Sequence, residues 1–215
     1  MIEFDEQAVE HLRGADDTLR KIIDERGPLD LETRTRGRPS DPYGALLRSI
    51  VGQQLSTKAA RSIYGRLTEQ FGGRAPTPQE LLEADPEVVR SAGLSRPKVN
   101  YLRSLAEHVV SGELALDRLP ELPDEEVARE VTAVKGLGQW TADMFLIFHL
   151  DRPDVLAVGD LGIRTAIRNE YDLAGLPSSA EMEELAAPWR PHRSTACRFL
   201  WRSLDAPGSP EADPI

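Results

Sequence analysis

Apolar residues recur every three to four positions along most of this chain, which is the spacing of amphipathic helices. One stretch carries Trp140, Met144 and Ile147 on this spacing, and the stretch before it places Val127 and Val131 one turn apart. No stretch shows the strict alternation of apolar and polar residues that is typical of a strand. The pattern therefore predicts an all-α protein, with helices over residues 6–25, 42–53, 57–71, 77–83, 86–92, 96–111, 123–134, 140–148, 162–170, 180–187 and 193–204.

Composition narrows the class of protein. The chain has 215 residues, enough for a substantial core, and it shows neither a long apolar run nor a basic and apolar leader at its start. These features predict a cytoplasmic protein of bacterial type with no membrane partner. Cys197 is the only cysteine and the four histidines lack metal-ligand spacing, so we expect no disulfide, no iron–sulfur cluster and no zinc site within the chain.

A short glycine hairpin, Lys135-Gly-Leu-Gly138, separates two of the predicted helices. Glycine tolerates positive φ, and its missing side chain lets an anion approach the amides at the start of the second helix. Such contacts would hold a nucleic-acid phosphate without reading base sequence, and Lys135 would add a positive charge. The alternative interpretation is an ordinary turn between helices.

The charge distribution bears on this phosphate hypothesis. The formal net charge of -10 opposes binding to a polyanion, but screening over about 10 Å makes local charge matter more than the total. We expect an acidic surface with one modest basic face, and therefore binding that depends steeply on salt. The residues expected on that face are Lys98, Lys135, Arg164, Arg168, Arg190, Arg193, Arg198 and Arg202.

An isolated carboxylate, Asp160, stands at the start of the predicted helix over 162–170. Aspartate is a favoured N-cap, so a purely structural role is one interpretation. The same position favours the charged form of a carboxylate, because the helix dipole and nearby amides stabilise an anion. A fixed negative charge can stabilise positive charge that develops on a substrate, so Asp160 is also a candidate catalytic residue.

Two segments in this order resemble one known family. Gly136-Leu-Gly-Gln-Trp-Thr-Ala142 is similar to the hairpin signature of the helix-hairpin-helix DNA glycosylase superfamily, and residues 155–164 are similar to the segment that delivers its catalytic aspartate. Residues 45–60 and 189–201 extend the resemblance. It implies two helical lobes with an active-site cleft between them, one from residues 1–41 with 151–215, the other a six-helix lobe over 42–150 that ends in the hairpin motif.

Within the superfamily the chain resembles the alkylpurine branch, the 3-methyladenine DNA glycosylase II type. Bifunctional members carry a nucleophilic lysine where this chain has Trp140, so the resemblance implies a monofunctional enzyme without AP lyase activity. The enzyme would bind double-stranded DNA containing alkylated bases as a monomer. It would flip out a purine of the 3-methyladenine or 7-methylguanine type and hydrolyse its N-glycosidic bond with Asp160 in base excision repair.

The resemblance also assigns a base pocket to Trp140, Trp201, Met144 and Leu161. An electron-rich indole can stack on a cationic purine, although a core aromatic is the alternative for Trp140. Met144 and Leu161 stand where relatives bring tyrosines, so the pocket is less aromatic than theirs. Trp189 is expected to be structural.

Two further assignments rest on the resemblance. Gln54, with Gln53 and Leu55 beside it, would be the wedge that fills the stack after the base has left, unless these glutamines only cap helix ends. No cofactor is required, but a structural Na⁺ or K⁺ would bind the hairpin through the main-chain carbonyls of Thr132, Val134 and Leu137.

Two alternative functions stay open on the sequence. One is a glycosylase for mismatched or oxidised bases, although the cluster cysteines of those branches are missing. The other is a helix-hairpin-helix protein that senses damage without catalysis. The retained Asp160 argues against this second alternative, whereas the missing aromatic residues support it.

Overall fold

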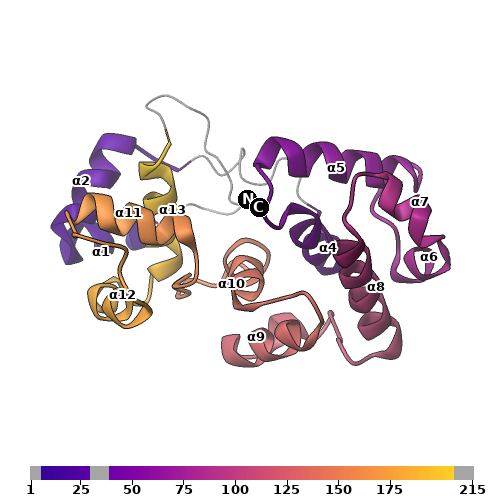
Figure 1. Ribbon diagram of the computed structural model, residues 1–215. Coiled ribbons are helices and arrows are strands. Elements are labelled where there is room, and N and C mark those ends of the chain that lie inside the picture. Colours follow the sequence, from indigo (N-terminus) through magenta and orange to yellow (C-terminus); the bar gives the residue numbers. More distant parts are fainter. Residues whose placement is uncertain (1–5, 30–38, 206–215) are drawn as a thin grey trace. The chain divides into compact units, whose positions relative to one another are not determined.

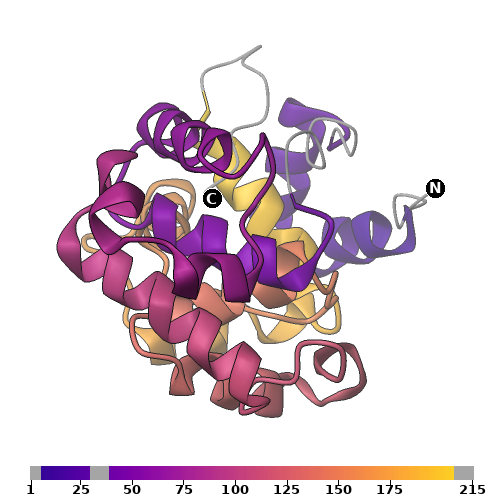
Figure 2. The same ribbon diagram turned by 90° about the vertical axis from the view of Figure 1, so that its right-hand side faces the viewer.

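The computed structural model describes residues 6–29 and 39–205, and the regular structure in these ranges is helical throughout (Figure 1 and Figure 2). The all-α prediction is confirmed. Contacts divide the described chain into two compact units, one formed by residues up to 29 together with 151–205, the other by residues 39–150. Residues 1–5, 30–38 and 206–215 lie outside the described residues.

The first unit combines the two ends of the chain. Helix α13 packs against α2 and α11, and α1 packs against α2. Phe199 and Leu200 of α13 are fully buried in the core of this unit. Its elements are α1 (Glu6–Ala15), α2 (Asp17–Arg26), α11 (Leu161–Glu170), α12 (Ser179–Leu185), the 3-10 turn η2 (Ala187–Trp189) and α13 (Arg193–Ser203).

The single helix predicted over residues 6–25 is wrong, because Asp16 divides it. One carboxylate oxygen of Asp16 accepts the amides of Thr18 and Leu19, at 2.8 and 3.0 Å, and so caps α2. The other oxygen accepts the Tyr171 hydroxyl at 2.7 Å and the Trp189 indole N–H at 2.9 Å. Burial and the neighbouring Asp16 raise the pKa of Tyr171, which therefore stays a donor. Trp189 is structural, as expected.

The second unit is continuous in sequence. Its helices begin close to the residues predicted, because side-chain caps and prolines set their first turns. The N-cap side chains are Asp41, Ser56, Thr77, Asp85 and Ser95. Its elements are α4 (Pro42–Gly52), α5 (Thr57–Glu69), α6 (Pro78–Glu83), α7 (Pro86–Ser91), α8 (Arg96–Ser111), the 3-10 turn η1 (Leu119–Glu121), α9 (Asp124–Ala133) and α10 (Gln139–Phe148).

Helix α8 is the centre of the second unit, with α4, α6 and α7 packed against it. Leu102 and Leu105 of α8 are fully buried, as are Leu47 and Ile50 of α4. Helix α10 packs against both α9 and α4. Helix α4 is therefore in contact with both α8 and the second helix of the α9–α10 hairpin.

Candidate functional site

The α9–α10 connection is a tight helical hairpin. Helix α9 ends where the Val134 amide donates to the Val131 carbonyl at 3.2 Å, and the Leu137 amide returns to the Val134 carbonyl at 3.0 Å. The Leu137 side chain is buried, whereas Lys135 is exposed. The hairpin is therefore anchored by one apolar side chain and presents its backbone and one cation outward.

Gly136 is fixed by two independent constraints. Its φ is +93°, which side chains rarely adopt, and an added Cβ would lie 2.1 Å from Cγ of Tyr101. The hairpin backbone thus lies directly against the Tyr101 ring of α8. Only glycine fits this position, so the turn role of Gly136 is demonstrated within the chain itself.

Neither backbone conformation nor a close contact among the described residues requires glycine at Gly138. Its φ of -109° suits other residues, and an added Cβ would meet nothing within 4 Å. It is exposed at the start of α10, where no side chain caps the helix. Within the described ranges, the amides of Gly138 and Gln139 have no acceptor. An open helix start with exposed amides and no side chain in front of them suits an anion from outside the chain.

The predicted wedge residues follow α4 in a short loop. Gln53 ends the helix, Gln54 adopts a positive φ of 58°, and Leu55 is 38% exposed. Gln54 is also exposed, but the Gln53 side chain is half-buried and donates to the Gly136 carbonyl at 2.8 Å. Gln54 and Leu55 can therefore reach a partner, while Gln53 is held against the hairpin.

Asp160 caps α11 and is almost completely buried, with 7% of its surface exposed. Its Oδ1 accepts the Ile163 amide at 2.8 Å and the Trp201 indole N–H at 2.8 Å. The capping interpretation and the catalytic one are thus compatible, because the cap bond fixes the orientation of the carboxylate. Trp201, predicted only as a pocket residue, holds this carboxylate directly.

Gly162 makes this contact possible. An added Cβ would lie 2.9 Å from Oδ1 of Asp160 and 3.1 Å from Cδ1 of Trp201. Real Cβ atoms essentially never lie as close as the first distance. The glycine is required where the indole approaches the carboxylate.

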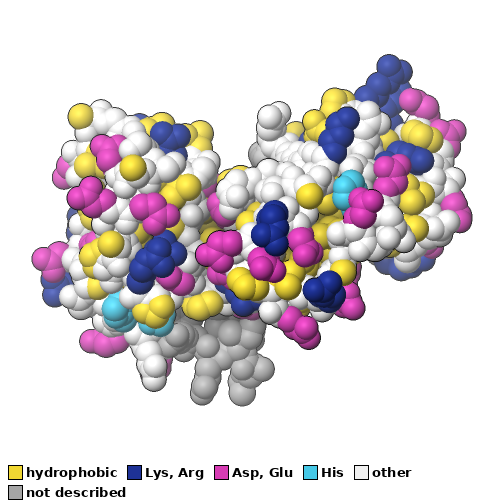
Figure 3. All heavy atoms as spheres, turned by 90° about the horizontal axis from the view of Figure 1, so that it is seen from below, with side chains coloured by type: hydrophobic (Ala, Val, Ile, Leu, Met, Phe, Trp, Pro, Cys, Tyr) yellow, Lys and Arg dark blue, Asp and Glu magenta, His cyan; other side chains and the backbone are white. Residues whose placement is uncertain are grey.

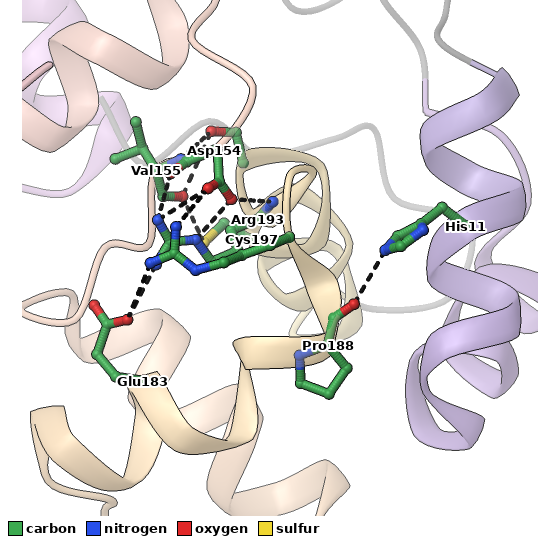
Figure 4. Close-up of polar contacts among 9 residues, drawn as sticks. His11, Asp154, Val155, Glu183, Pro188, Arg193 and Cys197 are labelled. Carbon is green, nitrogen blue, oxygen red and sulfur yellow. Dashed lines mark hydrogen bonds and ion pairs between the residues drawn. The ribbon is translucent and has the colours of Figure 1, made fainter. Parts of the chain in front are cut away.

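An ionic cluster around the buried Arg193 anchors the segment that leads to Asp160 (Figure 4). Arg193, at the start of α13, donates through Nε to Oδ1 of Asp154 at 2.7 Å and through a terminal nitrogen to the Asp154 carbonyl, also at 2.7 Å. Its other terminal nitrogen donates to Glu183 at 3.0 Å. The Val155 amide donates to the Ser194 hydroxyl at 3.0 Å. The Asp160 segment is therefore fastened to the helix that carries Trp201.

Most of the basic residues expected on a DNA-binding face also make contacts within their own unit. On the face shown in Figure 3, acidic and basic side chains are interspersed. Lys135 is exposed and has no partner within the described residues. The other expected residues bond as follows: Lys98 to the Val51 and Gln53 carbonyls, Arg164 to Pro177, Arg168 to Asn169, Arg190 and Arg193 to Asp154, Arg198 to Asp151 and Arg202 to Arg26.

The predicted pocket residues differ in exposure. Leu161 is 64% exposed directly beside Asp160, and Trp140 is half-buried at the start of α10. Met144 is fully buried, so its side chain offers no surface to a base in this structure. Trp140 and Met144 belong to the second unit, whereas Asp160, Leu161 and Trp201 belong to the first.

The described residues contain no group of three or more His, Cys, Asp or Glu side chains that could hold a metal ion. Cys197 is buried beside the Val155 carbonyl. At the hairpin, the Val134 carbonyl already accepts the Leu137 amide, and its second lone pair is compatible with a cation. In the described ranges, no helix is long and apolar enough to span a membrane.

Sequence reasoning missed Tyr101, the steric role of Gly162 and the Asp154–Arg193 pair. The contact partners of Tyr101 and Arg193 lie 35 and 39 residues away in sequence, and no local pattern marks such pairs. The sequence could have indicated close packing at Gly162, because a glycine in the first turn of a helix is unfavourable unless such packing requires it.

Comparison with known proteins assigns the family. The model of the HhH-GPD superfamily of base excision DNA repair proteins matches residues 47–191. The chain therefore belongs to this superfamily, whose hairpin motif it carries at Lys135-Gly-Leu-Gly138.

Relatives within the superfamily are 3-methyladenine DNA glycosylases. The chain is 33% identical over 195 residues to DNA-3-methyladenine glycosylase 1 of Schizosaccharomyces pombe, spanning 90% of this chain and 85% of the relative. A solved 3-methyladenine DNA glycosylase of that organism in complex with abasic DNA has a TM-score of 0.82 and 32% identity, covering 92% of this chain and 96% of that one. DNA-3-methyladenine glycosidase from Bacillus halodurans has a TM-score of 0.77 and 35% identity, covering 93% and 89%.

Proposed function

We propose that this protein is a monofunctional DNA glycosylase that hydrolyses the N-glycosidic bond of alkylated purines in base excision repair. It would act as a cytoplasmic monomer on double-stranded DNA. The observation that carries the proposal is the buried Asp160 carboxylate, oriented by two donors at one oxygen. Membership of the HhH-GPD superfamily and similarity to 3-methyladenine DNA glycosylases support it.

The chemistry suits a single carboxylate. Breaking the bond between C1′ and the base leaves positive charge on the sugar, which a nearby negative charge stabilises. The electron pair leaves with the base, and a purine alkylated at N3 or N7 departs readily because it already carries positive charge. Water then adds to C1′, and Asp160 would orient the water and accept its proton. The Trp201 and Ile163 donors hold the carboxylate in advance, so little reorganisation is needed.

The hairpin would grip the DNA backbone. The amides of Gly138 and Gln139 are open within the described chain, and Lys135 is exposed beside them. A phosphate bound there is held without base readout, as a repair enzyme that scans DNA requires. A monovalent cation on the carbonyls of the hairpin, those of Thr132, Val134 and Leu137, would add positive charge. Replacing K⁺ and Na⁺ with a large organic cation at constant ionic strength should then weaken binding to abasic DNA.

The candidate residues of the base pocket differ in what they could offer a substrate. Trp140 is half-buried and Leu161 is exposed, so each has surface to offer a flipped purine. Trp201 would form the wall beside Asp160. Met144 would act only by supporting the others, because it is fully buried.

Substitution of Asp160 tests the catalytic proposal. Asp160→Asn should abolish release of 3-methyladenine and 7-methylguanine from methylated DNA, measured by chromatography of the free bases, while binding to abasic DNA is retained. Asp85→Asn is the matched control, because Asp85 also caps a helix, α7, through the Glu87 amide at 2.8 Å. The control should remain as active as the wild type. Undiminished release by Asp160→Asn would show that the catalytic assignment is wrong.

The monofunctional proposal rests on Trp140 at the position of the nucleophilic lysine. Borohydride traps a Schiff base between an enzyme amine and the sugar. Incubation with abasic DNA and borohydride should therefore give no covalent complex, whereas a bifunctional glycosylase included as a positive control is captured. Efficient capture of this protein would contradict the proposal.

A further inference from the structure

The loop after α4 and the α9–α10 hairpin are joined by one side chain. Gln53 Nε2 donates to the Gly136 carbonyl at 2.8 Å, across 83 residues of sequence. The bond links the residue directly before Gln54 to the glycine at the tip of the hairpin. Two elements that would contact DNA in different ways are thus in direct contact.

Both elements also rest on the same turn of α8. Lys98 donates to the Val51 and Gln53 carbonyls, both at 2.7 Å, and so fixes the end of α4. Tyr101, three residues further along α8, lies against Gly136 so closely that a Cβ there would overlap its ring. Burial lowers the pKa of the Lys98 ammonium, in keeping with its enclosed position at these carbonyls.

The loop beyond Gln53 is exposed. Gln54 holds a positive φ of 58°, which is uncommon for a residue other than glycine, and both Gln54 and Leu55 are exposed. The chain turns back at once, because the Leu55 amide donates to the Gly52 carbonyl at 3.1 Å and Ser56 caps α5. An exposed segment with a strained backbone, here Gln54–Leu55, is typical of a functional loop when the residue before it is fixed.

We propose that Gln53 is a positioning residue that couples the phosphate-binding hairpin to the tip Gln54–Leu55. Its bond to Gly136 fixes the distance between the hairpin and the tip. A phosphate seated on the hairpin then sets how deeply the tip enters the base stack. This proposal rests on the proposed function, because it assumes that the hairpin holds phosphate and that the tip fills the space of a flipped base.

The coupling predicts which step depends on Gln53. The amides of Gly138 and Gln139 would hold the phosphate, whereas the Gly136 carbonyl accepts the Gln53 side chain. Loss of the Gln53 donor therefore leaves backbone binding intact and loosens the tip. Capture of a well-stacked lesion suffers most, whereas a lesion in a mismatch, which is already partly unstacked, depends less on the tip.

The experiment compares Gln53→Met with Gln70→Met. Methionine keeps the length of glutamine and removes the donor. Gln70 is the matched control, because its Nε2 also donates to a main-chain carbonyl in the same unit, that of Val88 at 3.0 Å. Base release is measured under single-turnover conditions for the same lesion in a matched and a mismatched pair. Insertion of the tip is followed by 2-aminopurine emission beside an abasic-site analogue.

Gln53→Met should slow release from the matched duplex by between about tenfold and about a hundredfold, the range typical of misplacement without loss of chemistry. The mismatched duplex should be affected at least about threefold less, because part of the unstacking is already done. Affinity for undamaged DNA should stay within about twofold, since the phosphate contacts are unchanged. The 2-aminopurine signal should fall, and Gln70→Met should match the wild type in every assay.

If Gln53→Met slowed base release equally from the matched and the mismatched duplex, or left the 2-aminopurine signal unchanged, the coupling would be overturned. Gln53→Met activity equal to that of Gln70→Met would do so as well. These outcomes differ from failure of the proposed function, in which the wild type itself releases no base. The 2-aminopurine comparison on the abasic analogue needs no chemistry, so it tests the coupling even in that case.

Discussion

The contact between Trp201 and Asp160 allows a sharp test of how the carboxylate is held. Trp201→Phe keeps an aromatic ring in the pocket and removes the indole N–H that donates to Oδ1 of Asp160 at 2.8 Å. The Ile163 amide remains as the second donor. We expect the variant to fold and to release bases more slowly than the wild type.

The expected change in the rate of base release follows from the kind of hydrogen bond that is lost. A hydrogen bond to a charged group contributes about 1.5 to 3 kcal/mol when it is shielded from water. Trp201 and Asp160 are 9% and 7% exposed, so solvent cannot replace the donor easily. Since each 1.4 kcal/mol corresponds to about a tenfold change, the rate of base release should fall between about tenfold and about a hundredfold.

The assay is single-turnover release of 3-methyladenine from methylated duplex DNA at saturating enzyme. Trp189→Phe is the matched control, because the Trp189 indole also donates to a half-buried carboxylate of the first unit, Asp16, at 2.9 Å. Both variants should lower the free energy of unfolding by about 2 to 4 kcal/mol, from the lost bond and the smaller ring. Thermal unfolding reports that change, and only Trp201→Phe should slow the folded enzyme.

Two results would refute the reasoning. An unchanged rate for Trp201→Phe would mean that Asp160 stays oriented without the indole N–H, and that Trp201 acts through packing. Equal slowing by Trp189→Phe, after both are corrected for the folded fraction, would mean that the rate follows the stability of the unit and not the orientation of Asp160.

Three further predictions concern the hairpin, the N-terminal helices and a surface cap. Gly136→Ala should lower the free energy of unfolding by about 3 kcal/mol or more, because of its positive φ and the Tyr101 contact. Gly138→Ala should change the free energy of unfolding by less than about 1 kcal/mol and weaken binding to abasic DNA about tenfold. Similar unfolding temperatures for the two variants would contradict this prediction. Asp16→Ala should destabilise the protein by about 3 kcal/mol or more in denaturant unfolding, because the α2 cap and the Tyr171 and Trp189 bonds are lost together, and a change below about 1 kcal/mol would contradict that role. The Arg74 side chain and the Thr77 amide lower the pKa of Glu80 from 4.5 to about 2, so its contribution to stability is complete above pH 4.5 and is lost as the pH falls through about 2. The stability difference between wild type and Glu80→Gln should shrink over that interval, and a constant difference would show that Glu80 titrates alike in the folded and unfolded chain.

Local sequence determined most of the secondary structure of this protein. Caps such as Ser95 and Thr77 and the prolines after them fix helix starts through bonds within one turn, so these starts are readable without the fold. The hairpin and Asp160 could likewise be found in the sequence, because a glycine turn and a helix cap are local motifs. The break at Asp16 was missed: its cap bonds to the Thr18 and Leu19 amides are local, but the Tyr171 and Trp189 donors that hold its other oxygen come from distant parts of the chain.

Tertiary structure alone decided what these motifs contact. The sequence contains Trp201, Gly162 and Asp160, but only the packing of α13 against α11 brings the indole to the carboxylate. It contains Gln53 and Gly136, but only α8 places the loop and the hairpin side by side through Lys98 and Tyr101. It suggested a basic face, most of whose members also bond within their own unit. The physical reason is that a capping bond closes within one helical turn, whereas the indole–carboxylate bond and the bonds around the hairpin join residues more than thirty positions apart and depend on how the helices pack.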